Sequence, residues 1–185
     1  MDRLFNNPSE PFYHSYTNLY LEAIDKDVYY EFASRHFQSA GKGLCKECFN
    51  RMYDALGGHT WYIQRLLSEM YASVEIGQTA DVDELNRAMQ HIHRLDRRFY
   101  EEALQQLTNP QKLLLIAIAK DIKAKEITSS DFVRRHSLKS SSSVQSAARS
   151  LYDAEIITRE EDVYFVTNRF LGLWLIERYG VGFRF

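Results

Sequence analysis

The feature that most constrains this 185-residue chain is the order of patterns between residues 108 and 179. Asn109-Pro110 begins an apolar helix that extends to about Ile122, since a proline in the first helical turn loses no hydrogen bond. Five serines, Leu138 and Lys139 fill the turn at residues 137–143. The same stretch contains three more helical patterns, at residues 131–136, 143–154 and 168–179.

The helix predicted from about Ser143 to Ala154 is the third in this stretch, and it has one apolar face. Its apolar residues recur with the i, i+3, i+4, i+7 spacing of a buried helix face, namely Val144, Ala147, Ala148 and Leu151. Two β-branched or aromatic runs follow at residues 156–159 and 163–166, and the acidic residues 160–162 between them predict a tight hairpin. Helix, short helix, turn, helix, hairpin and closing helix in this order are typical of a winged helix-turn-helix.

If this module binds DNA, its third helix lies in the major groove and basic side chains contact phosphates. Residues 120–150 contain seven Lys or Arg and three acids, an excess of +4 in a chain whose formal net charge is −2. The alternative is a protein-docking domain in which the serines only cap a helix, and the acidic hairpin Glu160-Glu161-Asp162 would repel a DNA backbone. Both alternatives stay open. The candidate DNA-contacting residues are Arg134, Arg135, Lys139, Ser142, Gln145, Ser146 and Arg149.

Composition indicates an ordinary globular chain, with 45% apolar and 26% charged residues, large enough for one sizeable domain or two small ones. No run approaches the roughly 20 apolar residues of a membrane span, so no membrane partner is expected. The first residues lack the pattern of a secretory signal, and two cysteines are too few for a disulfide scaffold, so a reducing, cytoplasmic location is predicted. Cys45 and Cys48 have no second pair and are interpreted as two small helix residues, with no metal site.

The first half of the chain is also helical, so the predicted fold class is mainly α, a helical bundle followed by the winged helix with its small β-hairpin. Helical patterns cover residues 28–40, 44–56 and 59–74, and Leu19, Leu21 and Ile24 alternate as in a short strand. Asp81 is expected to cap a long helix at residues 81–107, with Glu84 at the capping-box position. Its sparse apolar residues favour a connecting helix. The domains expected are residues 28–78, the connecting helix 79–107, and a winged helix domain at 108–185.

Several segments together carry a family resemblance. Gly57-Gly-His-Thr-Trp-Tyr-Ile-Gln-Arg-Leu-Leu67, a long helix, and a winged helix ending in Asn168-Arg-Phe-Leu-Gly-Leu-Trp-Leu175 resemble the C-terminal half of prokaryotic AAA+/STAND-type ATPases, which include the archaeal ATPase family. There a Gly-rich start to a lid helix precedes a helical linker and a winged helix, whose last helix typically reads Asp-Pro-Phe-Phe…Trp-Leu. Phe170, Trp174 and Leu175 match that pattern, whereas Asn168-Arg169 replaces Asp-Pro. The segment Pro11-Phe-Tyr-His-Ser15 is similar to the end of the nucleotide-binding core.

The resemblance implies that residues 28–78 are a lid and that residues 1–27 are a remnant of the core or a linker. It also implies that Gly57, Gly58 and His59 lie over a bound nucleotide, although His59-Thr60 stands where relatives often carry Gly-x-Pro. The alternative for His59 is a capping role at a helix start. The chain contains no Gly-x-x-x-x-Gly-Lys-Ser/Thr loop and no apolar strand ending in a metal-binding Asp.

The chain alone is therefore not expected to be an enzyme, and no catalytic residue is assigned. ATP and Mg²⁺ would belong to a parent ATPase, whose missing core would be a partner, and DNA or a protein would be the partner of the winged helix. The alternative function is a stand-alone winged-helix transcriptional regulator. An enzyme complete in this chain has little support, because the spacing of its acids and histidines predicts a solvated helix face at His91, His93, Asp96 and Glu101.

Overall fold

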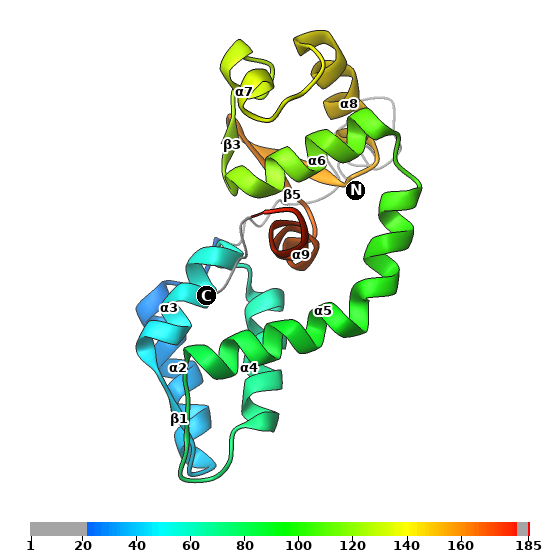
Figure 1. The fold of residues 1–185 in the computed structure, drawn as a ribbon. Coiled ribbons are helices and arrows are strands. Elements are labelled where there is room, and N and C mark those ends of the chain that lie inside the picture. The colour runs from blue at the N-terminus through cyan, green and yellow to red at the C-terminus, as the bar shows by residue number, and fades with distance from the viewer. Residues whose placement is uncertain (1–21, 181–184) are drawn as a thin grey trace, which may run out of the picture.

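The computed structural model describes residues 22–180 and residue 185, and the described chain is mainly helical (Figure 1). The segment at residues 11–15, Leu19 and Leu21 lie outside the described residues, and Ile24 lies in irregular chain. The helices are α2 (Lys26–Ser39), α3 (Lys46–Leu56), α4 (Thr60–Ser73), α5 (Val82–Gln105), α6 (Asn109–Asp121), α7 (Ser130–Arg135), α8 (Ser141–Asp153) and α9 (Arg169–Tyr179). The strands are β1 (Gly43–Leu44), β2 (Thr79–Ala80), β3 (Ala124–Lys125), β4 (Ile157–Glu160) and β5 (Val163–Val166).

The N-terminal helical unit consists of α2, α3, α4 and the first half of α5. Each helix buries one apolar face against the others, because its apolar residues recur at helical spacing. Tyr29 of α2 meets Phe49 of α3 edge to face, with ring centroids 5.5 Å apart. The parallel pair of β1 with β2 ties the start of α3 to the start of α5. The sequence did not predict this pair, since two-residue strands have no readable alternation.

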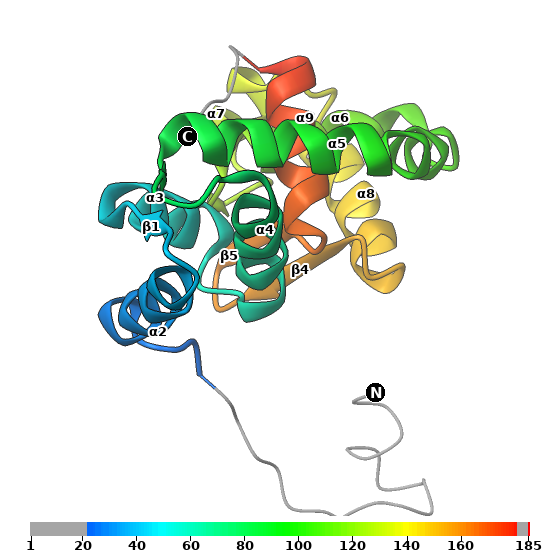
Figure 2. The same cartoon turned by 90° about the horizontal axis from the view of Figure 1, so that it is seen from below.

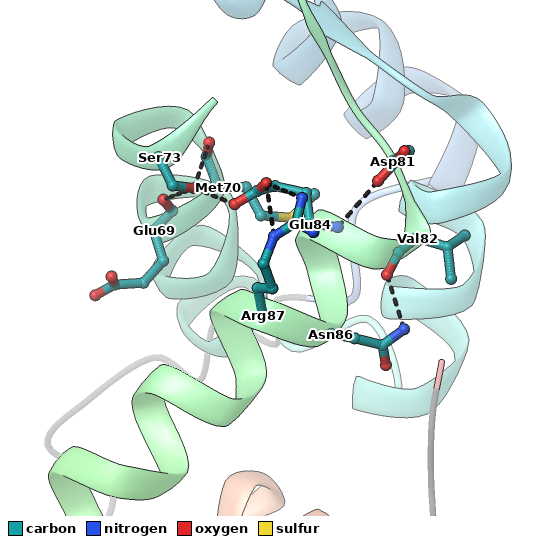
Figure 3. A network of polar contacts seen from close by, with 8 residues as sticks. All are labelled: Glu69, Met70, Ser73, Asp81, Val82, Glu84, Asn86 and Arg87. Carbon is teal, nitrogen blue, oxygen red and sulfur yellow. Dashed lines mark hydrogen bonds and ion pairs between the residues drawn. The ribbon is translucent and has the colours of Figure 1, made fainter. Parts of the chain in front are cut away.

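A buried carboxylate fixes the junction between α4 and α5 (Figure 3). The Asp81 side chain accepts a hydrogen bond from the Glu84 backbone N–H at 2.9 Å, so the predicted cap is confirmed. The predicted capping-box role of Glu84 is wrong, because its carboxylate accepts hydrogen bonds from the Ser73 hydroxyl and, at 2.6 Å, from the Arg87 guanidinium. Glu84 is only 8% exposed, and these two donors satisfy it.

The second unit has the predicted winged-helix order. Its elements follow in the order α6, β3, α7, α8, β4, β5 and α9, and the three strands form an antiparallel sheet in the order β3-β5-β4. The predicted hairpin is confirmed, with Ile157 opposite Val166 and Glu160 opposite Val163. The third strand, β3, was not predicted. The Thr108 side chain and Gln111 form a capping box at the start of α6, which positions this buried helix.

Helix α9 joins the two units. Figure 1 shows it between the N-terminal helices and the rest of the winged helix, and Figure 2 shows α5 crossing it. Phe170 packs edge to face on Tyr62 of α4 at 4.9 Å, and Trp174 packs on Tyr100 of α5 at 5.4 Å. The units therefore share an apolar interface in addition to their covalent link through α5. Among residues 22–180 and 185, no helix has both the length and the apolar character to cross a membrane.

Candidate functional site

The predicted DNA-contacting residues lie on α7, on α8 and in the turn between them. Figure 1 shows these helices at the end of the molecule remote from the N-terminal unit. Positions 142, 145, 146 and 149 are spaced to share one face of α8, which is the arrangement that insertion into a groove would require. All seven side chains are exposed, namely Arg134, Arg135, Lys139, Ser142, Gln145, Ser146 and Arg149.

Part of the serine run is structural. Helix α8 begins at Ser141, earlier than the sequence predicted, because Ser140 is its N-cap. The Ser140 hydroxyl accepts a hydrogen bond from the Ser143 backbone N–H at 3.2 Å and lies 3.1 Å from the Ser142 hydroxyl. Ser140 thus satisfies a backbone donor that the first helical turn would otherwise leave unpaired. Ser142 and Ser146 remain available on the outer surface.

Arg135 is held by the fold. Its guanidinium lies 2.5 Å from Asp121 at the end of α6, and the His136 ring lies 2.9 Å from the same carboxylate. His136 also packs on Phe132, with ring centroids 4.6 Å apart. This cluster ties α7 to α6 and orients the short helix. A phosphate contact by Arg135 would therefore compete with an existing ion pair.

The remaining basic residues of this face are less constrained. Arg134 pairs with Asp131 at 2.7 Å, and both side chains are more than 80% exposed, so water screens the pair strongly. Arg149 lies 4.0 Å from Asp153, at the limit of an ion pair. Lys139 has no ion-pair partner among the described residues. These three side chains can turn toward an anionic partner at little cost.

The hairpin between β4 and β5 is acidic and exposed at Glu160, Glu161 and Asp162. Arg159 lies 2.6 Å from Asp162 and offsets one of these charges. Glu161 adopts a positive φ of 53°, which closes the tight turn. The wing therefore presents net negative charge, which is unsuited to lying along a phosphate backbone.

Two glycines shape the corner between α3 and α4, where the sequence resemblance predicts nucleotide sensing. Gly57 has a φ of +63° and ends α3 in the left-handed conformation. Gly58 has a φ of +72°, and a Cβ there would lie 2.8 Å from the Tyr53 hydroxyl. Both positions need glycine for backbone reasons alone. Their role toward a nucleotide stays a prediction.

His59 follows these glycines at the N-cap of α4, but its side chain makes no capping hydrogen bond. The capping alternative for this side chain is therefore wrong. Its Nε2 lies 3.0 Å from the Arg169 guanidinium at the start of α9, so the corner joins the two units. In the sequence, Arg169 stands out only as a departure from the Asp-Pro of the resembled family. Helical periodicity could not pair it with His59, which is distant in the chain.

Arg169 is a largely buried cation with few partners among the described residues. Its side chain is 12% exposed, Glu160 lies 3.7 Å away, and the Phe165 ring centroid lies 4.4 Å from the guanidinium carbon. Its Nε has no hydrogen-bond partner among the described residues. Burial lowers the pKa of Arg169, and burial together with the neighbouring guanidinium lowers the pKa of His59.

Metal-binding chemistry is not assembled in the described part of the chain, where no group of three or more His, Cys, Asp or Glu residues could hold an ion. Cys45 is the N-cap of α3, and Cys48 is buried within that helix. Burial raises the pKa of the Cys48 thiol to about 12, which keeps it protonated at neutral pH. The interpretation of the two cysteines as helix residues therefore holds for Cys48, whereas Cys45 precedes the helix as its N-cap.

Comparisons with known proteins agree with the fold of the second unit. Residues 98–177 match a family model described as "Probable winged helix domain", so the match begins within α5 and extends into α9. No curated protein matches the chain, and no solved structure matches it. None of these comparisons returns an ATPase, so an ATPase parent stays a proposal. The chain is mainly helical and contains a winged helix domain, a module that binds DNA or protein.

Proposed function

We propose that this chain is the regulatory part of a nucleotide-dependent switch ATPase. The corner at residues 57–59 would lie over ATP and Mg²⁺ bound by a separate core. The observation that carries the proposal is the contact of His59 with Arg169 at 3.0 Å. It joins one basic group from each unit at the corner that the family resemblance assigns to the nucleotide.

The arrangement supports a switch for a physical reason. Within residues 22–180 and 185, the Nε of Arg169 has no hydrogen-bond partner, and its one acidic neighbour, Glu160, lies 3.7 Å away. A phosphate group would offer this guanidinium stronger, charge-assisted hydrogen bonds than it now makes. Movement of Arg169 toward phosphate would break its contact with His59. Nucleotide binding would thereby bias how the winged helix sits on the N-terminal helices.

The test uses the full-length protein that carries this segment together with the proposed core. We expect Arg169→Gln and His59→Gln each to weaken binding of a fluorescent ATP analogue by roughly tenfold or more, because one charge-assisted contact is lost. Arg159→Gln is the matched control, since Arg159 lies on the exposed wing. Circular dichroism at the assay temperature verifies that each variant is folded. Equal ATP affinity in all variants would remove the sensing role.

A second candidate function is DNA binding by α8, and the exposed face of that helix favours it. Four of its predicted contact residues share one face, and all four are exposed. Because the wing is acidic, contact would be limited to α8, α7 and the turn between them. The same geometry suits docking on a protein, so the two partner types need an experiment to separate them.

Fluorescence anisotropy with a labelled duplex at 50 and 200 mM salt makes that separation. If DNA is the partner, affinity falls steeply with salt, and Arg149→Gln reduces the log–log slope by about one unit. Arg51→Gln is the matched control, since Arg51 is an exposed helical arginine paired with Glu47 four residues earlier. Binding that is absent, or that does not depend on salt, would exclude DNA and leave a protein as the partner.

A further inference from the structure

A cavity of about 440 Å³ lies between α5 and α9, away from the α7–α8 face. Its composition differs from that of the apolar core, because most of its lining residues are basic or polar. Three of them are arginines from two helices, and Trp174 is the apolar member. The lining residues are Gln90, His93, Arg94, Arg97, Trp174, Glu177 and Arg178.

The charges on α5 are not balanced locally at this cavity. Arg94 has no hydrogen bond or ion pair among the described residues, whereas Arg97 and Arg98 each pair with the glutamate four residues later. The helical neighbours of Arg94 at i+3 and i+4 are those same two arginines. Like charges at this spacing repel each other and destabilise a helix. An anion bound at the cavity would relieve this repulsion.

The two acids near the cavity are already engaged. Glu101 is shared, since Arg97 lies 3.0 Å from it and Arg178 lies 3.1 Å from it. Glu177 lies 2.7 Å from Nδ1 of His93. Two carboxylates therefore face three guanidinium groups, which leaves an excess of one positive charge among these five side chains.

His93 adds a second observation that points to a ligand. Its side chain is 7% exposed, and its Nε2 has no hydrogen-bond partner in the described part of the chain. A buried ring nitrogen without a partner is uncommon, because its desolvation is uncompensated.

We propose that this cavity binds the phosphate group of a phosphate monoester. A phosphate carries about −1.5 to −2 charges and three strong acceptor oxygens, which match guanidinium groups converging from two helices. A carboxylate offers two oxygens and one charge, so it would leave part of the cluster unsatisfied. This inference does not depend on the proposed ATPase or DNA-binding functions, since no residue of the cavity belongs to those sites.

The experiment follows the Nε–Hε signals of arginine by NMR during titration with inorganic phosphate at low ionic strength and pH 7.5. We expect saturable shifts of the Arg94, Arg97 and Arg178 signals in the wild-type chain. Arg94→Gln should weaken binding by roughly tenfold and should fold normally, because this exposed side chain loses no hydrogen bond or ion pair to any described residue. Arg98→Gln is the matched control, since Arg98 is 91% exposed on the same helix and does not line the cavity.

A second variant tests the sign of the electrostatics. Glu101→Gln frees Arg97 and Arg178 from their shared acid, so it should strengthen phosphate binding, whereas a purely structural role would not. Titrations with ribose 5-phosphate and with a short phosphoserine peptide distinguish a small molecule from a modified protein as the source of the phosphate. Non-saturating shifts, equal affinity for acetate, or equal losses in Arg94→Gln and Arg98→Gln would overturn the proposal.

Discussion

Replacement of Phe170 by alanine is expected to destabilise both units of this protein together. Phe170 is 1% exposed at the start of α9, and it contacts the N-terminal unit through Tyr62 at 4.9 Å and Trp61 at 6.2 Å. Its ring therefore belongs to the core of the winged helix and to the interface between units. Truncation removes the transfer free energy of the ring and leaves a cavity that both units line.

The expected loss is about 3–5 kcal/mol in the free energy of unfolding, the range for deleting a fully buried Phe. The edge-to-face contact with Tyr62 accounts for about 0.5–1.5 kcal/mol of that loss. Typical domains have a total stability of only about 5–15 kcal/mol, so the change is large. With a urea m-value of about 2 kcal/mol/M, the unfolding midpoint should fall by about 1.5–2.5 M.

The chain contains two tryptophans, and one lies in each unit. Trp61 lies on α4 and Trp174 lies on α9, so the variants Trp61→Phe and Trp174→Phe each leave one fluorescent probe. In each background, urea unfolding is measured with and without Phe170→Ala. Because the units share an apolar interface, both probes should show the same shift of the midpoint.

Phe99→Ala is the matched control, since Phe99 is a phenylalanine of α5 that is 64% exposed. Its truncation should cost less than about 1 kcal/mol. A shift of the Trp174 transition alone in Phe170→Ala would refute the predicted coupling between the two units. That result would mean that the N-terminal helices fold and unfold without support from α9.

Three further predictions concern single titratable groups. Burial and a neighbouring arginine lower the pKa of His59 in the folded chain, so the unfolded chain binds this proton more readily. The stability of the fold should therefore decrease as pH falls through about 6.5. Thermal melts of His59→Gln should lack this part of the pH dependence. Burial opposes ionisation of Glu84, but hydrogen bonds from a serine and an arginine outweigh burial and lower its pKa. The Glu84 carboxylate should therefore stabilise the fold above about pH 4.5 and lose that effect as pH falls. Glu84→Gln should cost about 1–3 kcal/mol in the free energy of urea unfolding at pH 7. Ellman's reagent should modify Cys45 in the native protein and Cys48 only after unfolding. The reason is that Cys48 is fully buried and its thiol pKa is raised to about 12. Rapid labelling of both thiols in the native protein would contradict this prediction.

The helices and the hairpin could be predicted from sequence because each depends on local periodicity and on nearby caps. The apolar spacing at residues 144–151 is enough to define the buried face of α8, and the acidic residues at 160–162 mark the turn between β4 and β5. The candidate contact residues on α7 and α8 followed from the same pattern. Their function stays a prediction, since exposure is necessary for contact but does not identify a partner.

Contacts between distant segments were decided by the tertiary structure. The sequence indicated a connecting helix but not that α9 would pack on α4 and α5, and it gave no reason to pair His59 with Arg169 or His93 with Glu177. The short pairs formed by β1, β2 and β3 have too few residues to show a period. Local pattern determines which face of an element is apolar, whereas the partner that covers that face depends on how all the elements fill space together.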